Sequence, residues 1–207
     1  MKRQYRKLLT ISAAISIVMA TFIWAYFRHA PRALLERLRN DDRINLTKEE
    51  KASLIEEIIN QGDKSIDMLI DDIKLNGPEG GRESVSPGEI LKRMGEHAKQ
   101  RLADEIETMK TGNALSKNYP TTAYRSLLEC MIYHLDDLEY VDEWIAEYNR
   151  APNGEDQALI VLKVVRLAEK HGTLKSEYKG IPRGDKVDPV FIGWWKKNRD
   201  GLTTKTE

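Results

Sequence analysis

The sequence contains a single cysteine, Cys130, so no disulfide can form within one chain. Aromatic residues make up only 7% of the sequence against 32% charged residues, a balance typical of amphipathic helices rather than of β-sandwiches or barrels. No segment alternates apolar and polar residues for long enough to predict a strand. These deficits favour an all-α fold.

The chain also lacks an excess of charge. Lysine and arginine together number 33, as do aspartate and glutamate, which leaves a formal net charge of zero. Without its basic N-terminal head, the remainder is mildly acidic. This balance argues against nucleic acid as a partner.

Motifs that carry chemistry are missing as well. There is no Gly-x-Ser-x-Gly, and Gly80-Gly81 is not followed by the Lys-Ser/Thr of a phosphate loop. The acidic pair Asp136-Asp137 has no calcium-type ligand loop around it. The four histidines are scattered, at His29, His97, His134 and His171. A zinc site needs clustered ligands, so we expect no metal, no cofactor and no catalytic residue.

One long uncharged run is present, from Leu8 to Phe27. As a helix, it would span about 30 Å, the thickness of a bilayer's hydrocarbon core. Trp24, Tyr26 and Phe27 lie at its far end, where a membrane interface would be. We predict that 1–30 is a basic head followed by an uncleaved single-pass anchor.

Two other interpretations of this run stay open. Val18-Met19-Ala20 could be the cleavage site of a signal peptide. A buried soluble helix is disfavoured because both ends of the run are basic. The short N-terminal side carries four cations, Lys2, Arg3, Arg6 and Lys7. They favour a cytoplasmic N-terminus and a domain outside the cytoplasm.

The rest of the chain divides into 31–46, a juxtamembrane segment, 47–202, a helical domain, and 203–207, a polar tail. Two helix starts are marked by Thr47 with Glu50, a capping-box pair, and by Ser86-Pro87 with Glu89 three residues after the serine. Gly62 and Gly95 are suited to the ends of the helices that follow these starts.

Two segments align without gaps. GDKSIDMLIDDIK, 62–74, matches GEHAKQRLADEIE, 95–107, at an offset of 33 residues. The alignment makes Leu69 equivalent to Leu102 and Ile73 equivalent to Ile106. Each copy follows another amphipathic helix, so the repeating unit is a helix, a glycine turn and a second helix.

This unit resembles the HEAT-repeat family. Met94-Gly95-Glu96-His97-Ala98, followed by Leu102 and Ile106, is the better match, and the segment from Ile59 to Ile73 is the next. A third pair over 124–148 lacks the glycine. The resemblance implies a short α-solenoid of stacked helical pairs; an irregular helical bundle is the alternative.

Two surfaces follow from this architecture. Asp71 and Asp72 recur as Asp104 and Glu105, and in stacked repeats these four acids would form a ladder that binds a basic or polar segment of a partner protein. A purely solvating charged face is the alternative. The C-terminal residues Phe191, Trp194 and Trp195 resemble the tail that closes HEAT-like arrays in some bacterial envelope proteins.

The sequence thus predicts a non-catalytic, membrane-anchored scaffold or adaptor with an unnamed protein partner. The alternative is an accessory subunit of a membrane complex that packs through its anchor helix. Small residues suited to such packing are Ser12, Ala13, Ala14, Ser16 and Ala20. An unrecognised enzyme is disfavoured because no titratable residues cluster in the sequence.

Overall fold

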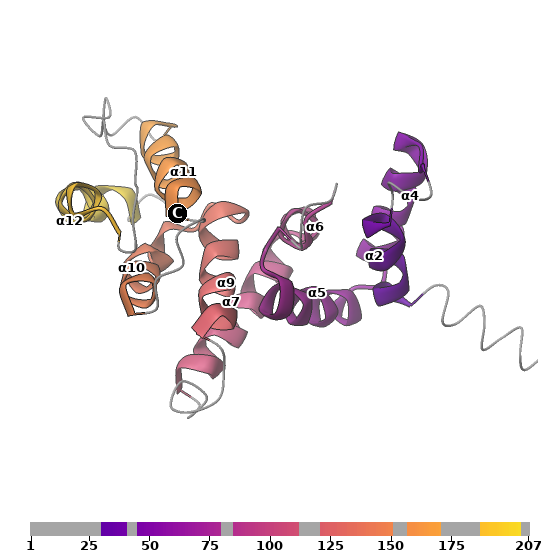
Figure 1. Ribbon diagram of the computed structural model, residues 1–207. Coiled ribbons are helices and arrows are strands. Elements are labelled where there is room, and N and C mark those ends of the chain that lie inside the picture. Colours follow the sequence, from indigo (N-terminus) through magenta and orange to yellow (C-terminus); the bar gives the residue numbers. More distant parts are fainter. Residues whose placement is uncertain are drawn as a thin grey trace, which may run out of the picture. The chain divides into compact units, whose positions relative to one another are not determined.

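The computed structural model describes residues 30–40, 45–79, 85–111, 121–150, 157–170 and 187–203, and every element in these ranges is a helix (Figure 1). The elements are α2 (Pro31–Arg39), α4 (Lys48–Ile59), α5 (Asp63–Asn76), α6 (Pro87–Met94), α7 (Glu96–Thr111), α9 (Thr121–Tyr133), the short 3₁₀ helix η1 (Leu138–Tyr140), α10 (Val141–Arg150), α11 (Gln157–Lys170) and α12 (Pro189–Thr203). The predicted all-α fold is confirmed for these residues.

The predicted anchor, 8–27, lies outside the described residues. Within the described residues, no helix is long and apolar enough to cross a membrane.

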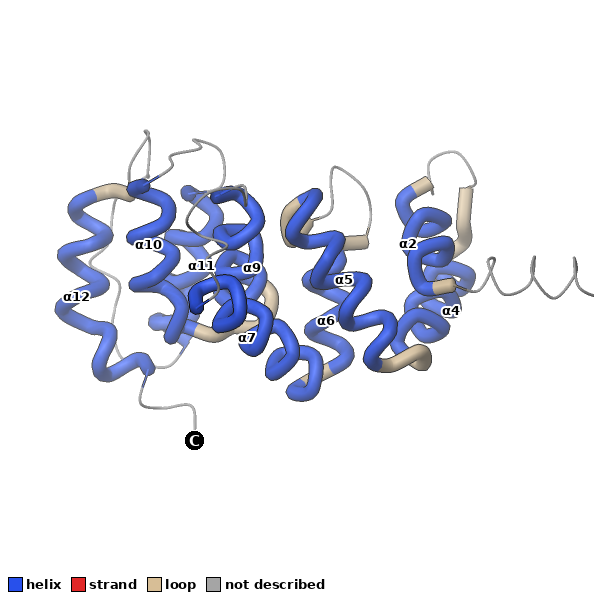
Figure 2. The backbone as a smooth tube through the Cα atoms, turned by 90° about the horizontal axis from the view of Figure 1, so that it is seen from below, coloured by secondary structure: helices blue, strands red, loops and turns tan. Residues whose placement is uncertain are grey.

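The chain divides into two compact units, 1–65 and 66–207, and the boundary falls inside α5. In the first unit α2 packs against α4 (Figure 2). The two helices bury five large apolar side chains, those of Leu34, Leu35, Leu38, Leu54 and Ile58. These side chains form the described apolar core of the first unit.

Both predicted helix starts are confirmed. The Thr47 hydroxyl accepts from the Glu50 backbone N–H at 3.2 Å, and the Glu50 carboxylate accepts from the Thr47 N–H at 2.8 Å. This reciprocal pair satisfies two amides that have no partner within the helix. Ser86 likewise accepts from the Glu89 N–H at 3.0 Å, with Pro87 in the first helical position.

Five described residues have a positive φ angle, and three of them lie at the turns of the predicted helical pairs. Gly62 has φ 58° and Gly95 has φ 78°, as their position after a helix predicted. The third is Asp136, with φ 56°, which follows α9. Aspartate tolerates the left-handed region better than most residues. An aspartate with a positive φ angle therefore stands where the third pair lacks a glycine.

The second unit is organised around α9, which packs against α7, α10, α11 and η1. Figures 1 and 2 show α10 and α11 beside it. Its buried residues cover most of the helix surface and include two charged ones, Arg125 and Glu129. Their side chains pair, Nε to Oε1 at 3.4 Å, and Glu129 also accepts from the Trp144 indole at 3.3 Å. A charged pair buried in this way needs such partners.

The aligned positions of the repeat are core positions. Leu69, Ile73, Leu102 and Ile106 are all buried, as predicted. Lys99 breaks the apolar match because it aligns with the buried Ile66. Its ammonium lies 2.9 Å from an Asp137 carboxylate oxygen, beyond the end of α9. An ion pair thus occupies a position that an apolar contact fills in the other copy.

The predicted C-terminal cap residues lie on α12. Phe191 and Trp195 are buried, and the Trp195 indole donates to Asp142 on α10 at 2.9 Å. Trp194 is half-buried and stacks on Phe191, with 5.9 Å between the ring centroids. Arg199 also pairs with Asp142, at 2.7 Å. These contacts join α12 to α10; the closing of a repeat array stays a prediction.

The core positions make a stability prediction. Leu69→Ala and Leu102→Ala should each lower the free energy of unfolding by about 2–5 kcal/mol, because each removes buried methyl groups and leaves a cavity. Asp104→Ala, on the exposed side of α7, should change it by no more than about 0.5 kcal/mol. Urea melts of the three variants measure both effects. Equal losses at Leu102 and Asp104 would contradict the core assignment.

Candidate functional site

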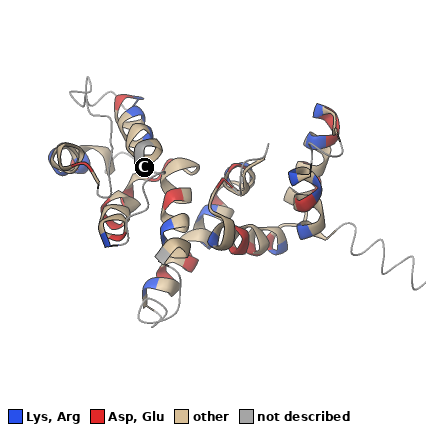
Figure 3. Cartoon of the chain, viewed as in Figure 1, with Lys and Arg blue, Asp and Glu red and all other residues tan. Residues whose placement is uncertain are grey.

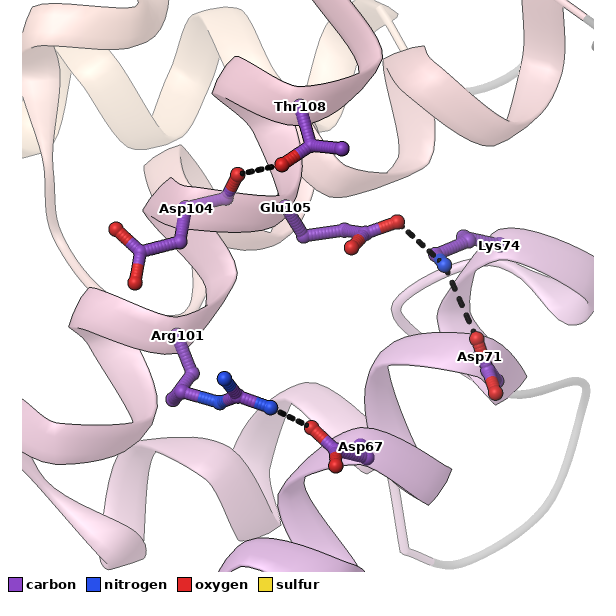
Figure 4. Close-up of polar contacts among 7 residues, drawn as sticks. All are labelled: Asp67, Asp71, Lys74, Arg101, Asp104, Glu105 and Thr108. Carbon is purple, nitrogen blue, oxygen red and sulfur yellow. Dashed lines mark hydrogen bonds and ion pairs between the residues drawn. The ribbon is translucent and has the colours of Figure 1, made fainter. Parts of the chain in front are cut away.

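The four acids predicted to bind a partner lie at the α5–α7 edge of the second unit. Asp71 and Asp104 are exposed, and Asp72 and Glu105 are half-buried. Lys74 lies between the two helices, with its ammonium 3.0 Å from Asp71 and 2.6 Å from Glu105 (Figure 4). One lysine therefore pairs with an acid from each copy of the repeat.

Other residues engage the remaining acids. Asp72 accepts from the Asn76 amide and Asp104 from the Gln100 amide, both at 3.0 Å. Arg101 pairs with Asp67 across the same edge (Figure 4). A groove of about 320 Å³ runs here, lined by four carboxylates and two cations among its eight residues. It is net negative, but its cations are interleaved with the acids, and its binding role stays a prediction.

Lys74 illustrates how the edge is balanced. Partial burial lowers the pKa of its ammonium, but hydrogen bonds to Glu105 and Asp71 outweigh that effect and hold the pKa above its usual value. Lysine and acid thus stabilise one another across the edge. Figure 3 shows that charged residues of both signs are interspersed along the helices.

A larger recess, of about 690 Å³, lies in the second unit where α6, the end of α9 and α11 meet. Its lining combines a histidine, three acids, four cations, a tyrosine and three leucines. These residues are Glu79, Glu89, Lys92, Tyr133, His134, Asp136, Leu159, Leu162, Lys163, Arg166, Leu167 and Lys170. We call this recess the α11 groove.

His134 is the buried polar group of the α11 groove, with only 5% of its surface exposed. Its Nε2 lies 3.0 Å from a Glu79 carboxylate oxygen, and its Nδ1 lies 3.8 Å from one of Glu89. Burial lowers the pKa of the imidazole, and the two carboxylates only partly oppose that effect. The ring is therefore neutral at pH 7.

Gly88 allows His134 to lie against the first turn of α6. A Cβ atom at this position would be 2.3 Å from the His134 Cδ2 atom, far inside contact distance. The Gly88 N–H also donates to the Pro78 carbonyl at 3.2 Å. A residue without a side chain is thus required where the helix meets the imidazole.

Asp136 pairs with two lysines at one side of the groove. Its Oδ1 lies 2.6 Å from the Lys163 ammonium and its Oδ2 lies 3.5 Å from that of Lys92. Burial raises the pKa of this carboxyl, but the hydrogen bond and charge of Lys163 outweigh that effect and lower it overall. The carboxylate is thus charged and already occupied by two cations.

The exposed face of α11 changes character along its length. Leu159 and Leu162, near its start, are 51% and 42% exposed, and Arg166 and Lys170 follow toward its end, both exposed. Neither Arg166 nor Lys170 forms an ion pair with any residue that the structure describes. The groove therefore has an apolar end and a cationic end.

A second pocket, of about 370 Å³, adjoins the α11 groove and shares Glu79, Tyr133 and Leu159 with it. Its lining adds Leu75, which is 74% exposed. Within the described part of the chain, three of the four exposed large apolar side chains therefore surround these two adjoining hollows. The fourth is Val190, on α12.

Among the described residues, no group of three or more histidine, cysteine, aspartate or glutamate side chains is placed to hold a metal ion. Cys130 is fully buried, as its position in an apolar helix predicted. Burial raises the pKa of its thiol, so the reactive thiolate is disfavoured.

Comparison with protein-family models, with curated proteins and with solved structures finds no match for this chain. The HEAT-repeat resemblance therefore stays a prediction.

Sequence reasoning missed the α11 groove. It treated His134 as one isolated histidine and Asp136 as part of a solvated pair, because nothing local connects either with Glu79 or Glu89. One signal was available in α11. Its apolar residues exceed what a single buried face needs, since Leu159 and Leu162 lie away from the buried Val161, Val164 and Ala168.

The contact between Gly88 and His134 can be tested by a double-mutant cycle. Gly88→Ala should lower the free energy of unfolding by about 1–3 kcal/mol, because the new methyl group overlaps the imidazole. In a His134→Ala background the same substitution should cost much less, because the ring is gone. Denaturant melts of the four proteins measure the coupling. Additive losses would contradict the contact.

The lowered pKa of His134 predicts a pH dependence. In the unfolded chain the imidazole has a pKa of about 6.5 and takes up a proton as the pH falls through that value. The native state binds that proton only at lower pH, so its stability is complete above about pH 6.5 and declines below it.

Urea melts between about pH 7.5 and about pH 5.5 measure this decline. His134→Gln should make this decline shallower. If the free energy of unfolding depends on pH in the same way for the wild type and for His134→Gln, the pKa of His134 is the same in the folded and unfolded states.

Proposed function

We propose that this protein is a non-catalytic, membrane-anchored adaptor that binds a partner protein through the α11 groove. The observation that carries the proposal is the exposure of Leu75, Leu159 and Leu162 around two adjoining hollows. Clustered apolar side chains beside polar residues mark interaction surfaces, whereas single ones need no explanation.

The energy of these leucines sets the scale of the interaction. Full burial of a leucine side chain gains about 1.5–3 kcal/mol, and the three are already partly covered. Association costs at least about 4 kcal/mol in lost freedom of motion. The leucines therefore offset little more than that cost, and a stable complex needs polar contacts as well.

The chemistry of the groove supports binding rather than catalysis. Both ring nitrogens of His134 face glutamates, and Asp136 lies between two lysines. The described residues that line the groove include no serine, threonine or cysteine that His134 could activate as a nucleophile.

The membrane part of the proposal rests on the uncharged run 8–27 and its basic flanks. An adaptor held in this way would be confined to a membrane. The alternative, an accessory subunit that packs through its anchor helix, rests on the small residues of the same run. It predicts a partner that contacts the anchor and leaves the groove free.

Site-specific photocrosslinking in native membranes tests the role of the groove. A photoreactive residue at position 159 or 162 of the full-length chain should give one discrete adduct with another protein. The matched control is position 190, where Val190 is 64% exposed on α12 but outside the groove. We expect no adduct of that size there.

Two results would overturn the proposal. One is the absence of any adduct at 159 and 162, and the other is the same adduct at all three positions. An adduct formed only from positions within 8–27 would favour the accessory-subunit alternative.

A further inference from the structure

If the α11 groove is an interaction site, as proposed above, its charged residues indicate the chemistry of the partner. Lys92 and Lys163 pair with Asp136, whereas Glu79 and Glu89 lie beside His134, which is neutral and does not cancel their charge. Arg166 and Lys170 have no such counter-ion among the described residues. With His134 neutral, the lining holds four cations and three carboxylates, and the two cations without a counter-ion lie together toward the end of α11. The positive charge open to a partner is therefore at that end.

The position of one of these two cations, Lys170, is explained by the helix itself. Lys170 ends α11, where a positive charge is favoured by the partial negative charge of the helix terminus. Arg166 lies one turn earlier, beyond Leu162 on the exposed face, and this explanation does not apply to it. A guanidinium left in a groove is suited to pairing with a carboxylate.

The order of residues along α11 fixes the pattern of the partner. Leu159 and Leu162 lie within one turn, Arg166 follows one turn later and Lys170 one turn after that. At a rise of 1.5 Å per residue, the stripe is about 16 Å long. A complementary segment has apolar residues at one end and acidic residues one and two turns further along.

A membrane surface fits this site less well than a protein segment does. A basic, leucine-bearing helix face can bind anionic lipids. Here, however, the stripe lines a recess, which a flat lipid surface would reach poorly.

We propose that the α11 groove binds an acidic amphipathic helix of a partner protein. Its apolar residues contact Leu159 and Leu162, and its carboxylates pair with Arg166 and Lys170. A helix completes an unpartnered helix face by the same packing that joins helices within a domain.

The probe is a synthetic helical peptide of about 14 residues, long enough for about 21 Å. It carries two leucines three positions apart and glutamates one and two turns beyond them. A second peptide has glutamine in place of each glutamate, and a third has lysine. Fluorescence anisotropy measures their binding to the full-length protein in nanodiscs of neutral lipid.

We expect the acidic peptide to bind most tightly and to lose affinity as salt rises from about 50 mM to about 500 mM, because exposed charges are screened. The double variant Arg166→Glu/Lys170→Glu should weaken its binding by about tenfold or more. The matched control, Lys196→Glu/Lys197→Glu, makes the same charge change at exposed positions on α12 and should alter the affinity by less than about twofold. The lysine peptide should bind the groove variant better than the wild type.

Several outcomes would overturn this proposal. They are the absence of measurable binding of the acidic peptide, equal binding of the glutamate and glutamine peptides, and an unchanged affinity in the groove variant. Binding of anionic vesicles that depends on Arg166, without peptide binding, would assign the groove to lipid instead.

The crosslinking experiment separates this inference from the proposed function. If the adduct at position 159 persists in the Arg166→Glu/Lys170→Glu variant, the groove is an interaction site and its partner is not acidic. If position 159 gives no adduct at all, the proposed function itself is wrong.

Discussion

The second unit depends on the burial of α9, which packs against α7, α10, α11 and η1 and leaves little of its surface to water. Its two charged residues lie inside, where Glu129 contacts Arg125 and the Trp144 indole, and Arg125 also lies over the Tyr148 ring at 5.6 Å. Because α9 is held in this way, the residues at its end, His134 and Asp136, have fixed positions against α6 and α11.

Local features of the fold could be predicted from the sequence, and long-range ones could not. The caps at Thr47 and Ser86 and the turn at Gly62 depend on neighbouring residues, and the structure confirms them. The buried repeat positions follow from helical periodicity. The contact of His134 with Glu79 joins residues 55 positions apart, and no periodic pattern connects them.

Positive and negative charges balance over the whole chain and also within single sites. At the α5–α7 edge, Lys74 and Arg101 are interleaved with the acids that the sequence had suggested as a continuous ladder. The recurrence of the acids is visible in the sequence. The position of Lys74 and Arg101 among them depends on how α5 and α7 lie side by side, which the sequence alone does not reveal. In the α11 groove, by contrast, pairing inside the recess leaves the far end of α11 positive.

Asp136 has two roles, one in the backbone and one in the groove. Its positive φ angle would be less strained with glycine, whereas its carboxylate pairs with Lys92 and Lys163 at the groove. A change to glycine would relax the chain and at the same time release two positive charges beside Arg166. A single substitution, Asp136→Gly, would thus remove both the backbone strain and the carboxylate that pairs with the two lysines.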